Sequence, residues 1–264
     1  MAESETTVVL GGGTSSLPLK ARLSAMMFLQ YFAQGCYLPI ASVYLQDALH
    51  FDGRQIGTFN SALAVGPLLA PFVIGQLIDR HVATQYVLAF CHLLAGLLMF
   101  GLYTQTSYAS VMVLGTLYSV LYVPTMMLTN SLSFHHLASQ AREFPLIRFW
   151  GTAGFVVPAW LIELVLLRGL TGSELNTARG VAFWLSGAAS LAMALYALTL
   201  PHTPPQRREG RRFAPGAVIG MLRHRNFAVL VAVSFGIAIV HNDWDWPSSS
   251  WDSAARCWLA PPPI

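Results

Sequence analysis

Apolar residues occur along this chain in long runs separated by short polar segments. A bilayer core requires about 20 apolar residues per helical span, whereas membrane β-strands are about 10 residues long and alternate apolar with polar side chains. Six runs have the length of a helical span, and they lie at 23–46, 56–78, 84–104, 108–130, 145–167 and 180–200. The pattern therefore predicts an all-α integral membrane protein with a six-helix bundle.

The composition supports a membrane environment. Hydrophobic residues make up 55% of the chain and charged residues only 10%. A soluble domain typically has about 25% charged residues, so this chain has too few to cover a surface that faces water. The lipid bilayer is its expected surrounding. The net charge of +3 does not indicate a nucleic-acid partner, because the cations gather in particular loops.

The distribution of cations predicts the orientation. If the six runs alternate in direction, eleven of the 15 Lys and Arg side chains lie on one side. These are Lys20, Arg22, Arg80, Arg142, Arg148, Arg207, Arg208, Arg211, Arg212, Arg223 and Arg225. The other side has only Arg54, Arg168 and Arg179. Because cytoplasmic loops carry the excess of Lys and Arg, we expect the N-terminus and the 201–226 loop in the cytoplasm and the chain in the plasma membrane.

The same features divide the chain into five segments. Residues 1–19 are expected to form a flexible cytoplasmic tail, and residues 20–200 the six-helix bundle. Residues 201–226 begin PHTPPQRREGRR and form a basic cytoplasmic linker, because prolines and charges end a membrane helix. The run at 227–240 is expected to begin a seventh helix, and 241–264 form an atypical tail.

The seventh run is short for a membrane span. The 14 residues at 227–240 rise only about 21 Å as a helix, against a hydrocarbon core of about 30 Å. The tail that follows, HNDWDWPSSSWDSAARCWLAPPPI, is polar and rich in tryptophan. One interpretation is an interfacial tail with its tryptophans at the headgroups. We favour a second, in which a frameshift or an incomplete gene model interrupts the span and the chain is about half of a larger protein.

The segment GQLIDRHVAT at 75–84 resembles a loop signature of the major facilitator superfamily, in which a glycine is followed four residues later by Asp-Arg. By this resemblance Gly75 allows close helix approach, and Asp79 and Arg80 form a conformational latch with neighbouring helix ends. The usual basic residues are missing after His81. The alternative is an ordinary turn at a helix end with one cation at the interface.

Three further stretches resemble the nucleoside:proton symporter family within that superfamily. They are LHFDGRQIG at 49–57, FPLIRFWGTAGF at 144–155 and TLPHTP at 199–204. The resemblance covers roughly 20–240 and implies proton-driven uptake of nucleosides, with nucleoside and protons as partners. It also implies that this chain is the N-terminal half, and that a missing C-terminal bundle is needed for a complete pathway.

Arg148 is the most unusual residue of the fifth run, because a charge at the bilayer centre costs at least about 2.5–3.5 kcal/mol. Arg148, Thr152 and Phe155 are spaced i, i+4, i+7 and share one helix face. Gly151 and Gly154 beside them allow another helix to pack closely. A guanidinium, a hydroxyl and a ring suit a nucleoside, and the resemblance implies that these positions face the substrate cavity. Alternatively, Arg148 extends to the phosphates at the cytoplasmic end.

Other polar residues in the runs have two interpretations. Gln30, Tyr31 and Gln34 either line the cavity or form hydrogen bonds between helices. Tyr118 and Tyr122 are candidates for the cavity wall.

Four further polar residues are assigned mainly structural roles. Asn60 and His92 are expected to be packing groups with satisfied hydrogen bonds, and Asn130 to cap the end of the fourth run. Glu163 could bind a proton or be a solvated end residue.

No catalytic or cofactor motif was found, so we expect neither an enzyme nor a bound cofactor. His135 and His136 are adjacent and lack partners at metal-ligand spacing. The sequence GGGTSS at 11–16 lacks the GK[ST] ending of an ATP-binding loop. Two alternatives to nucleoside transport stay open: transport of another small polar solute, such as a sugar or an aromatic acid, and a membrane fragment that does not transport.

The charge asymmetry makes a testable prediction about orientation. A cysteine introduced at Gln206 should be protected from an impermeant thiol reagent added to intact cells, because the 201–226 loop is expected in the cytoplasm. A cysteine at Gly172 should react, because it lies in a loop with few cations. If position 206 were labelled and position 172 protected, the predicted orientation would be wrong, and the 201–226 loop would lie outside the cell.

Overall fold

The computed structural model describes residues 14–63, 66 and 82–204, together with 225, 228–229 and 232–233. The chain divides after Arg207 into two units, and the fold described below is that of the first unit. In the described ranges all regular structure is helical. The candidate latch of Gly75, Asp79 and Arg80 lies outside the described residues, as does most of the expected seventh helix.

The helices agree with the runs read from the sequence. Their bounds are α1 Leu17–Asp47, α2 Gly53–Leu63, α4 Thr84–Thr104, α5 Tyr108–His136, α6 Gln140–Trp160, η2 Leu161–Leu166, α7 Gly172–Ala178 and α8 Val181–Ala197. In the described part of the chain, four helical segments are long and apolar enough to cross a bilayer: Thr84–Thr104, Tyr108–His136, Gln140–Leu166 and Gly172–Ala197. The expected span at 56–78 is described only in its first part.

Helix α1 has the length of a span but a more polar sequence. Its 31 residues extend over about 46 Å, yet it is not among the four most apolar segments. Its polar side chains include Gln30 and Gln34 near the middle of the helix. A membrane helix with polar residues at this depth faces protein or a cavity rather than lipid.

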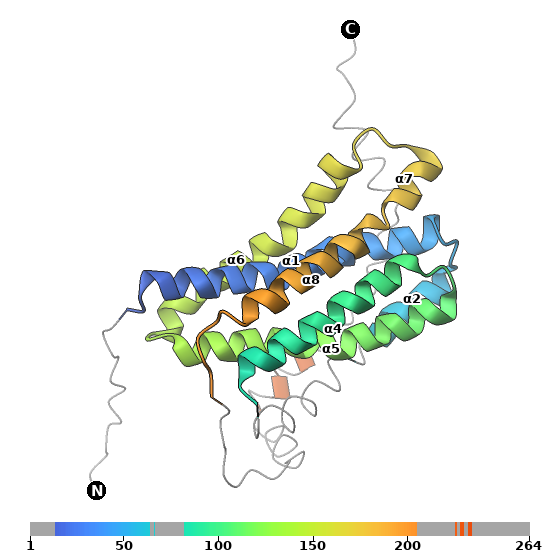
Figure 1. Ribbon diagram of the computed structural model, residues 1–264. Helices are drawn as coiled ribbons and strands as arrows, with labels where there is room; N and C mark the ends of the chain where they lie inside the picture. The colour runs from blue at the N-terminus through green and yellow to red at the C-terminus, as the bar shows by residue number, and fades with distance from the viewer. Residues whose placement is uncertain are drawn as a thin grey trace, which may run out of the picture. The chain divides into compact units, whose positions relative to one another are not determined.

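The helices pack side by side in one layered bundle (Figure 1). Helix α1 lies between α6 and α8, and α4 lies between α8 and α5. Helix α2 packs on α5. Three clusters of buried side chains fill the bundle in the described part of the chain. One is centred on Met26, Leu88 and Leu132, a second on Phe59 and Tyr118, and a smaller third on Cys36 and Ile162.

Large apolar side chains also cover the outside of the bundle. Phe90 on α4, Trp160 on α6 and Leu195 on α8 are all more than half exposed, at 56%, 67% and 70%. In a soluble protein such a surface would mark a binding site or an aggregation hazard. Here the apolar surface suits contact with lipid tails, as expected for a multi-pass membrane protein.

Helices α1 and α6 approach each other closely because glycines lie at their crossing. A Cβ atom on Gly154 of α6 would collide with the backbone of Phe28 in α1. A Cβ atom on Gly35 of α1 would collide with the backbone of Phe155 in α6. The two backbones are therefore in direct contact, and the packing predicted for Gly154 is confirmed. Small residues serve the same purpose in other membrane helix pairs.

Glu143 joins the first residues of the fold to the start of α6. Its carboxylate, only 6% exposed, pairs with Lys20 Nζ at 2.7 Å and accepts hydrogen bonds from the backbone N–H and hydroxyl of Ser15 at 2.8 and 2.7 Å. Helix α1 begins at Leu17, with Pro18 in its first turn. The end of the expected flexible tail, 1–19, is therefore ordered: residues 17–19 are already helical, and Ser15 before them is bonded to the buried Glu143 carboxylate.

Some local details differ from expectation. Asn130 does not cap a helix, because α5 continues to His136 and the Asn130 Oδ1 is buried without a partner among the described residues. Asn60 is exposed rather than packed. The fifth span ends in a π-helical turn, η2, which contains Glu163.

The contact between α1 and α6 predicts the effect of adding one methyl group. Gly154→Ala should destabilise the folded protein by about 1–3 kcal/mol, the usual cost of overpacking, because the facing backbone of Phe28 cannot move aside. The matched control is Gly57→Ala in α2, where a Cβ meets nothing within 4 Å; it should stabilise by about 0.5–1 kcal/mol. Unfolding of the purified chain in detergent measures both. Equal effects of the two substitutions would contradict the close packing.

Candidate functional site

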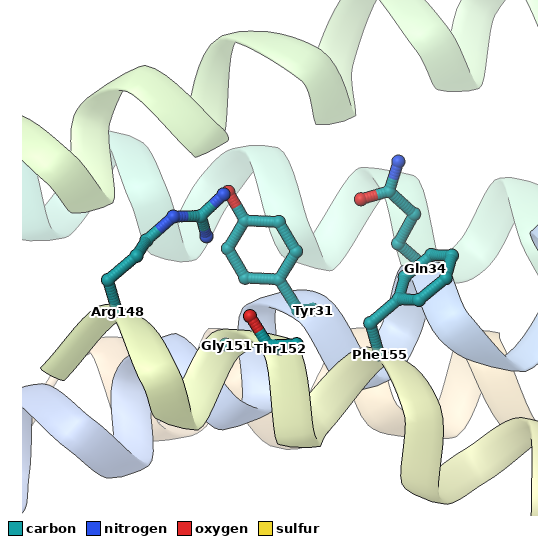
Figure 2. Close-up of a pocket in the computed structure, with 6 residues that line it drawn as sticks. All are labelled: Tyr31, Gln34, Arg148, Gly151, Thr152 and Phe155. Carbon is teal, nitrogen blue, oxygen red and sulfur yellow. The ribbon is translucent and has the colours of Figure 1, made fainter. Parts of the chain in front are cut away.

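A pocket of about 240 Å³ lies between α1 and α6. It is lined by Tyr31, Gln34, Arg148, Gly151, Thr152 and Phe155. Figure 2 shows Arg148 and Tyr31 at one end, Gln34 and Phe155 at the other, and the Thr152 hydroxyl between them. Four residues predicted from the sequence, Gln34, Arg148, Thr152 and Phe155, therefore come together in one cavity.

Helix α6 supplies the wall with the mixed chemistry. Arg148, Thr152 and Phe155 are successive residues of one helix face, as their spacing predicts, and all three border the pocket. Thr152 is exposed, whereas Arg148 and Phe155 are half-buried. The wall thus offers a cation, a hydroxyl and an aromatic face along about two turns of helix.

Arg148 is directed toward α1. Its guanidinium carbon lies 4.2 Å from the centre of the Tyr31 ring, which is a cation–π arrangement. In the described part of the chain, the ion pairs are made by Lys20 and Arg179, and none involves Arg148. The guanidinium is therefore held by no carboxylate among the described residues, and the ring of Tyr31 offsets part of the cost of placing a charge in the membrane.

Gly151 allows Tyr31 and Arg148 to meet. A Cβ atom at this position would lie 2.8 Å from Cδ2 of Tyr31 and 3.0 Å from Nη1 of Arg148. Any larger residue would push the ring or the guanidinium away from its present place. Gly151 therefore shapes the cavity as well as the helix packing.

Gln34 borders the pocket, but Gln30 does not. The Gln30 side chain is fully buried and bonds to Thr125 and His92, each at 2.8 Å. Of the two roles considered for Gln30, the structure shows the hydrogen bond between helices. His92 is buried with one satisfied nitrogen, Nε2, as expected, while its Nδ1 has no partner among the described residues.

Two other candidates for the cavity wall lie in the core. Tyr118 and Tyr122 on α5 are each 1% exposed, and their rings stack with centroids 5.0 Å apart. They do not border the pocket, because this face of α5 is turned toward the inside of the bundle. The expectation that they line the cavity is wrong for this pocket.

Glu163 lies in η2, the π-helical turn that follows α6, away from the pocket. Its carboxylate is 3.5 Å from Nε of Arg179, and Nη1 of Arg179 lies 3.6 Å from the carboxylate of Asp47 at the end of α1. With a side chain 43% exposed, Glu163 behaves as a solvated end residue, and Arg179 at the end of α7 connects it to the end of α1.

Sequence reasoning missed two parts of the site. The contact between Tyr31 and Arg148 joins residues far apart in the chain, and no local spacing indicates it. Thr125 was not singled out, although it is a hydroxyl residue in an apolar run, three positions after Tyr122. Both become visible only when the helices are placed next to one another.

The chain was compared with known families. The family described as the nucleoside H+ symporters matches residues 17–245. This protein belongs to that family. The relationship read from three short stretches of sequence is thereby confirmed, and the relatives found are transporters rather than enzymes.

Relatives and a solved structure agree with the assignment. The nucleoside permease NupG of Escherichia coli (strain K12) is 29% identical over 198 residues, which cover 74% of this chain and 45% of the permease. Xanthosine permease of the same organism is 30% identical, with 71% of this chain and 44% of the permease covered. A crystal structure of NupG is similar at a TM-score of 0.69 and 26% identity, covering 81% of this chain and 53% of that one. The predicted fold class is confirmed, and the chain spans about half the length of these relatives.

Proposed function

We propose that this chain forms part of a proton-coupled nucleoside transporter and that the pocket between α1 and α6 is one wall of its nucleoside site. The observation that supports this most directly is the meeting of Arg148, Thr152, Phe155 and Gln34 in one cavity. The family supplies the substrate class, because its description names both a nucleoside and a proton.

The chemistry of the pocket suits the two parts of a nucleoside. The guanidinium of Arg148 donates several hydrogen bonds from a planar fork, and with the Thr152 hydroxyl it can bind ribose or base oxygens. The ring of Phe155 offers a face on which a base can stack. The amide of Gln34 both donates and accepts, which matches the mixed edge of a base.

The pocket supplies only one side of a transport pathway. Among the described residues, its lining comes from α1 and α6. Transporters of this architecture bind substrate near the midplane between two bundles and alternate access by rocking one against the other. We infer that a second bundle closes the site, that the N-terminus faces the cytoplasm of a cell whose plasma membrane holds the protein, and that Gly75, Asp79 and Arg80 act as the conformational latch.

The central prediction concerns Arg148. Arg148→Ala should weaken nucleoside binding by about 1.5–3 kcal/mol, the range for hydrogen bonds to a charged group. Arg148→Lys should rescue poorly, because an ammonium cannot reproduce the planar fork. The matched control is Arg54→Ala, which removes an exposed cation remote from the pocket. Equilibrium dialysis of labelled uridine and adenosine against the purified chain measures binding, alone and co-expressed with the part of NupG that the chain does not match.

The other pocket residues give a graded series in the same assay. Thr152→Val should cost about 0.5–1.5 kcal/mol, the value of a neutral hydrogen bond, and Phe155→Ala about 1–3 kcal/mol of base stacking. A hexose and an aromatic acid serve as competitors. Displacement of the nucleoside by either one would indicate that the site binds that class of solute instead. If Arg148→Ala and Arg148→Lys both bound nucleoside as tightly as the parent chain, the proposed role in binding would be wrong, and Arg148 would be an anchor at the membrane interface.

A further inference from the structure

Gln30 precedes Tyr31 in α1, but its side chain is held by α4 and α5. Its Nε2 lies 2.8 Å from Thr125 Oγ1, and its Oε1 lies 2.8 Å from His92 Nε2. Its backbone carbonyl accepts a hydrogen bond from the hydroxyl of Tyr122. The side chains of all these partners are buried, so no water competes for the bonds.

The direction of each hydrogen bond follows from the donors available. Thr125 Oγ1 donates to the carbonyl oxygen of Tyr122 at 2.5 Å, so it accepts from the amide nitrogen of Gln30. The amide oxygen then faces His92, and because this oxygen can only accept, His92 donates from Nε2. Each group therefore donates to the next: His92 on α4 to Gln30 on α1, Gln30 to Thr125 on α5, and Thr125 to the carbonyl oxygen of Tyr122.

We propose that Gln30 is a positioning residue for the pocket. Its bonds to His92 and Thr125 fix the rotation of α1 about its own axis. That rotation holds Tyr31 beneath the guanidinium of Arg148. The proposal rests on the proposed function for the identity of the ligand, whereas the positioning itself can be tested without any ligand.

A small rotation of α1 is enough to disturb the pocket. Side chains reach about 5–6 Å from a helix axis, so a rotation of about 10° moves a side-chain tip by about 1 Å. The Tyr31 ring has little room for such a shift, since it lies against Gly151 on one side and 4.2 Å below the guanidinium carbon of Arg148. Binding groups generally have to be held within about 0.5 Å.

A buried amide suits this role better than an apolar side chain. Apolar side chains pack adequately in several rotations of a helix. A buried amide has one favourable arrangement, because any other leaves its polar atoms without partners in a medium that offers none. A single buried polar residue selects one register in coiled coils by the same mechanism.

The test measures how fast phenylglyoxal modifies Arg148 in the full chain in membranes, read by mass spectrometry of the peptide. Exposed Arg54 is the internal reference. Tyr31→Ala should raise the Arg148 rate by about threefold, the factor that corresponds to a cation–π contact of ordinary strength. His92→Leu should raise it in the same direction, because the unpaired Gln30 amide no longer fixes α1.

A rescue and a double substitution separate positioning from general stability. His92→Gln keeps an N–H donor near the place of Nε2 and should restore the parental rate. In a Tyr31→Ala background, His92→Leu should add nothing, since effects that act through one residue are not additive. The control is Ser133→Ala, equally buried, whose hydrogen bond to Thr129 stays within α5; it should leave the rate unchanged.

Three results would overturn the proposal: a parental Arg148 rate in His92→Leu, no rescue by His92→Gln, or a further increase in the Tyr31→Ala background. If His92→Leu does not insert into the membrane, the isosteric Thr125→Val is judged by the same criteria. Nucleoside binding is measured in parallel. If the parent chain bound no nucleoside, the proposed function would be wrong. The positioning role of Gln30 would still be tested by the rates of Arg148 modification.

Discussion

The direct backbone contact between α1 and α6 is the constraint on which the pocket depends. Gly35 and Gly154 bring the two helices together, since a Cβ atom at either would collide with the facing backbone. At this separation Gly151 leaves just the space that the Tyr31 ring fills. Side chains from both helices can then border one small cavity instead of projecting separately away from the two helices.

The position of Arg148 follows from this contact. A cation in a membrane span requires a partner or a route to water, and here the ring of Tyr31 provides an electron-rich face at 4.2 Å. The charged groups near the two ends of this span, α6 with η2, are arranged differently. Glu143 near the start of α6 pairs with Lys20, and Glu163 in η2 pairs with Arg179. These pairs fix the helix ends, whereas among the described residues Arg148 forms no ion pair and lies against the Tyr31 ring.

Behind the pocket lies a second, dry layer of polar groups. Gln30, His92, Thr125 and Tyr122 connect three helices without contact with the cavity. Two adjacent residues of α1 thus have separate tasks, since Gln30 faces inward and Tyr31 faces α6. This arrangement is consistent with α1 being less apolar than the four segments that most resemble membrane spans: of its two central glutamines, Gln30 is buried in protein and Gln34 borders the cavity.

The sequence by itself determined the fold class, the positions of the helices, the family and the set of residues on the α6 face. These properties depend on local pattern, because the length of an apolar run fixes a span and the i, i+4, i+7 spacing fixes a helix face. Four predicted residues, Gln34, Arg148, Thr152 and Phe155, therefore border the pocket.

Only the tertiary structure separated Gln30 from Gln34, paired Tyr31 with Arg148 and placed Tyr118 and Tyr122 in the core. Gln30 and Gln34 are one turn apart and look alike in sequence. Their roles differ because α4 and α5 lie against one of them and α6 lies near the other. The rotation of one helix against its neighbours depends on contacts between residues distant in the chain, and no local pattern records it.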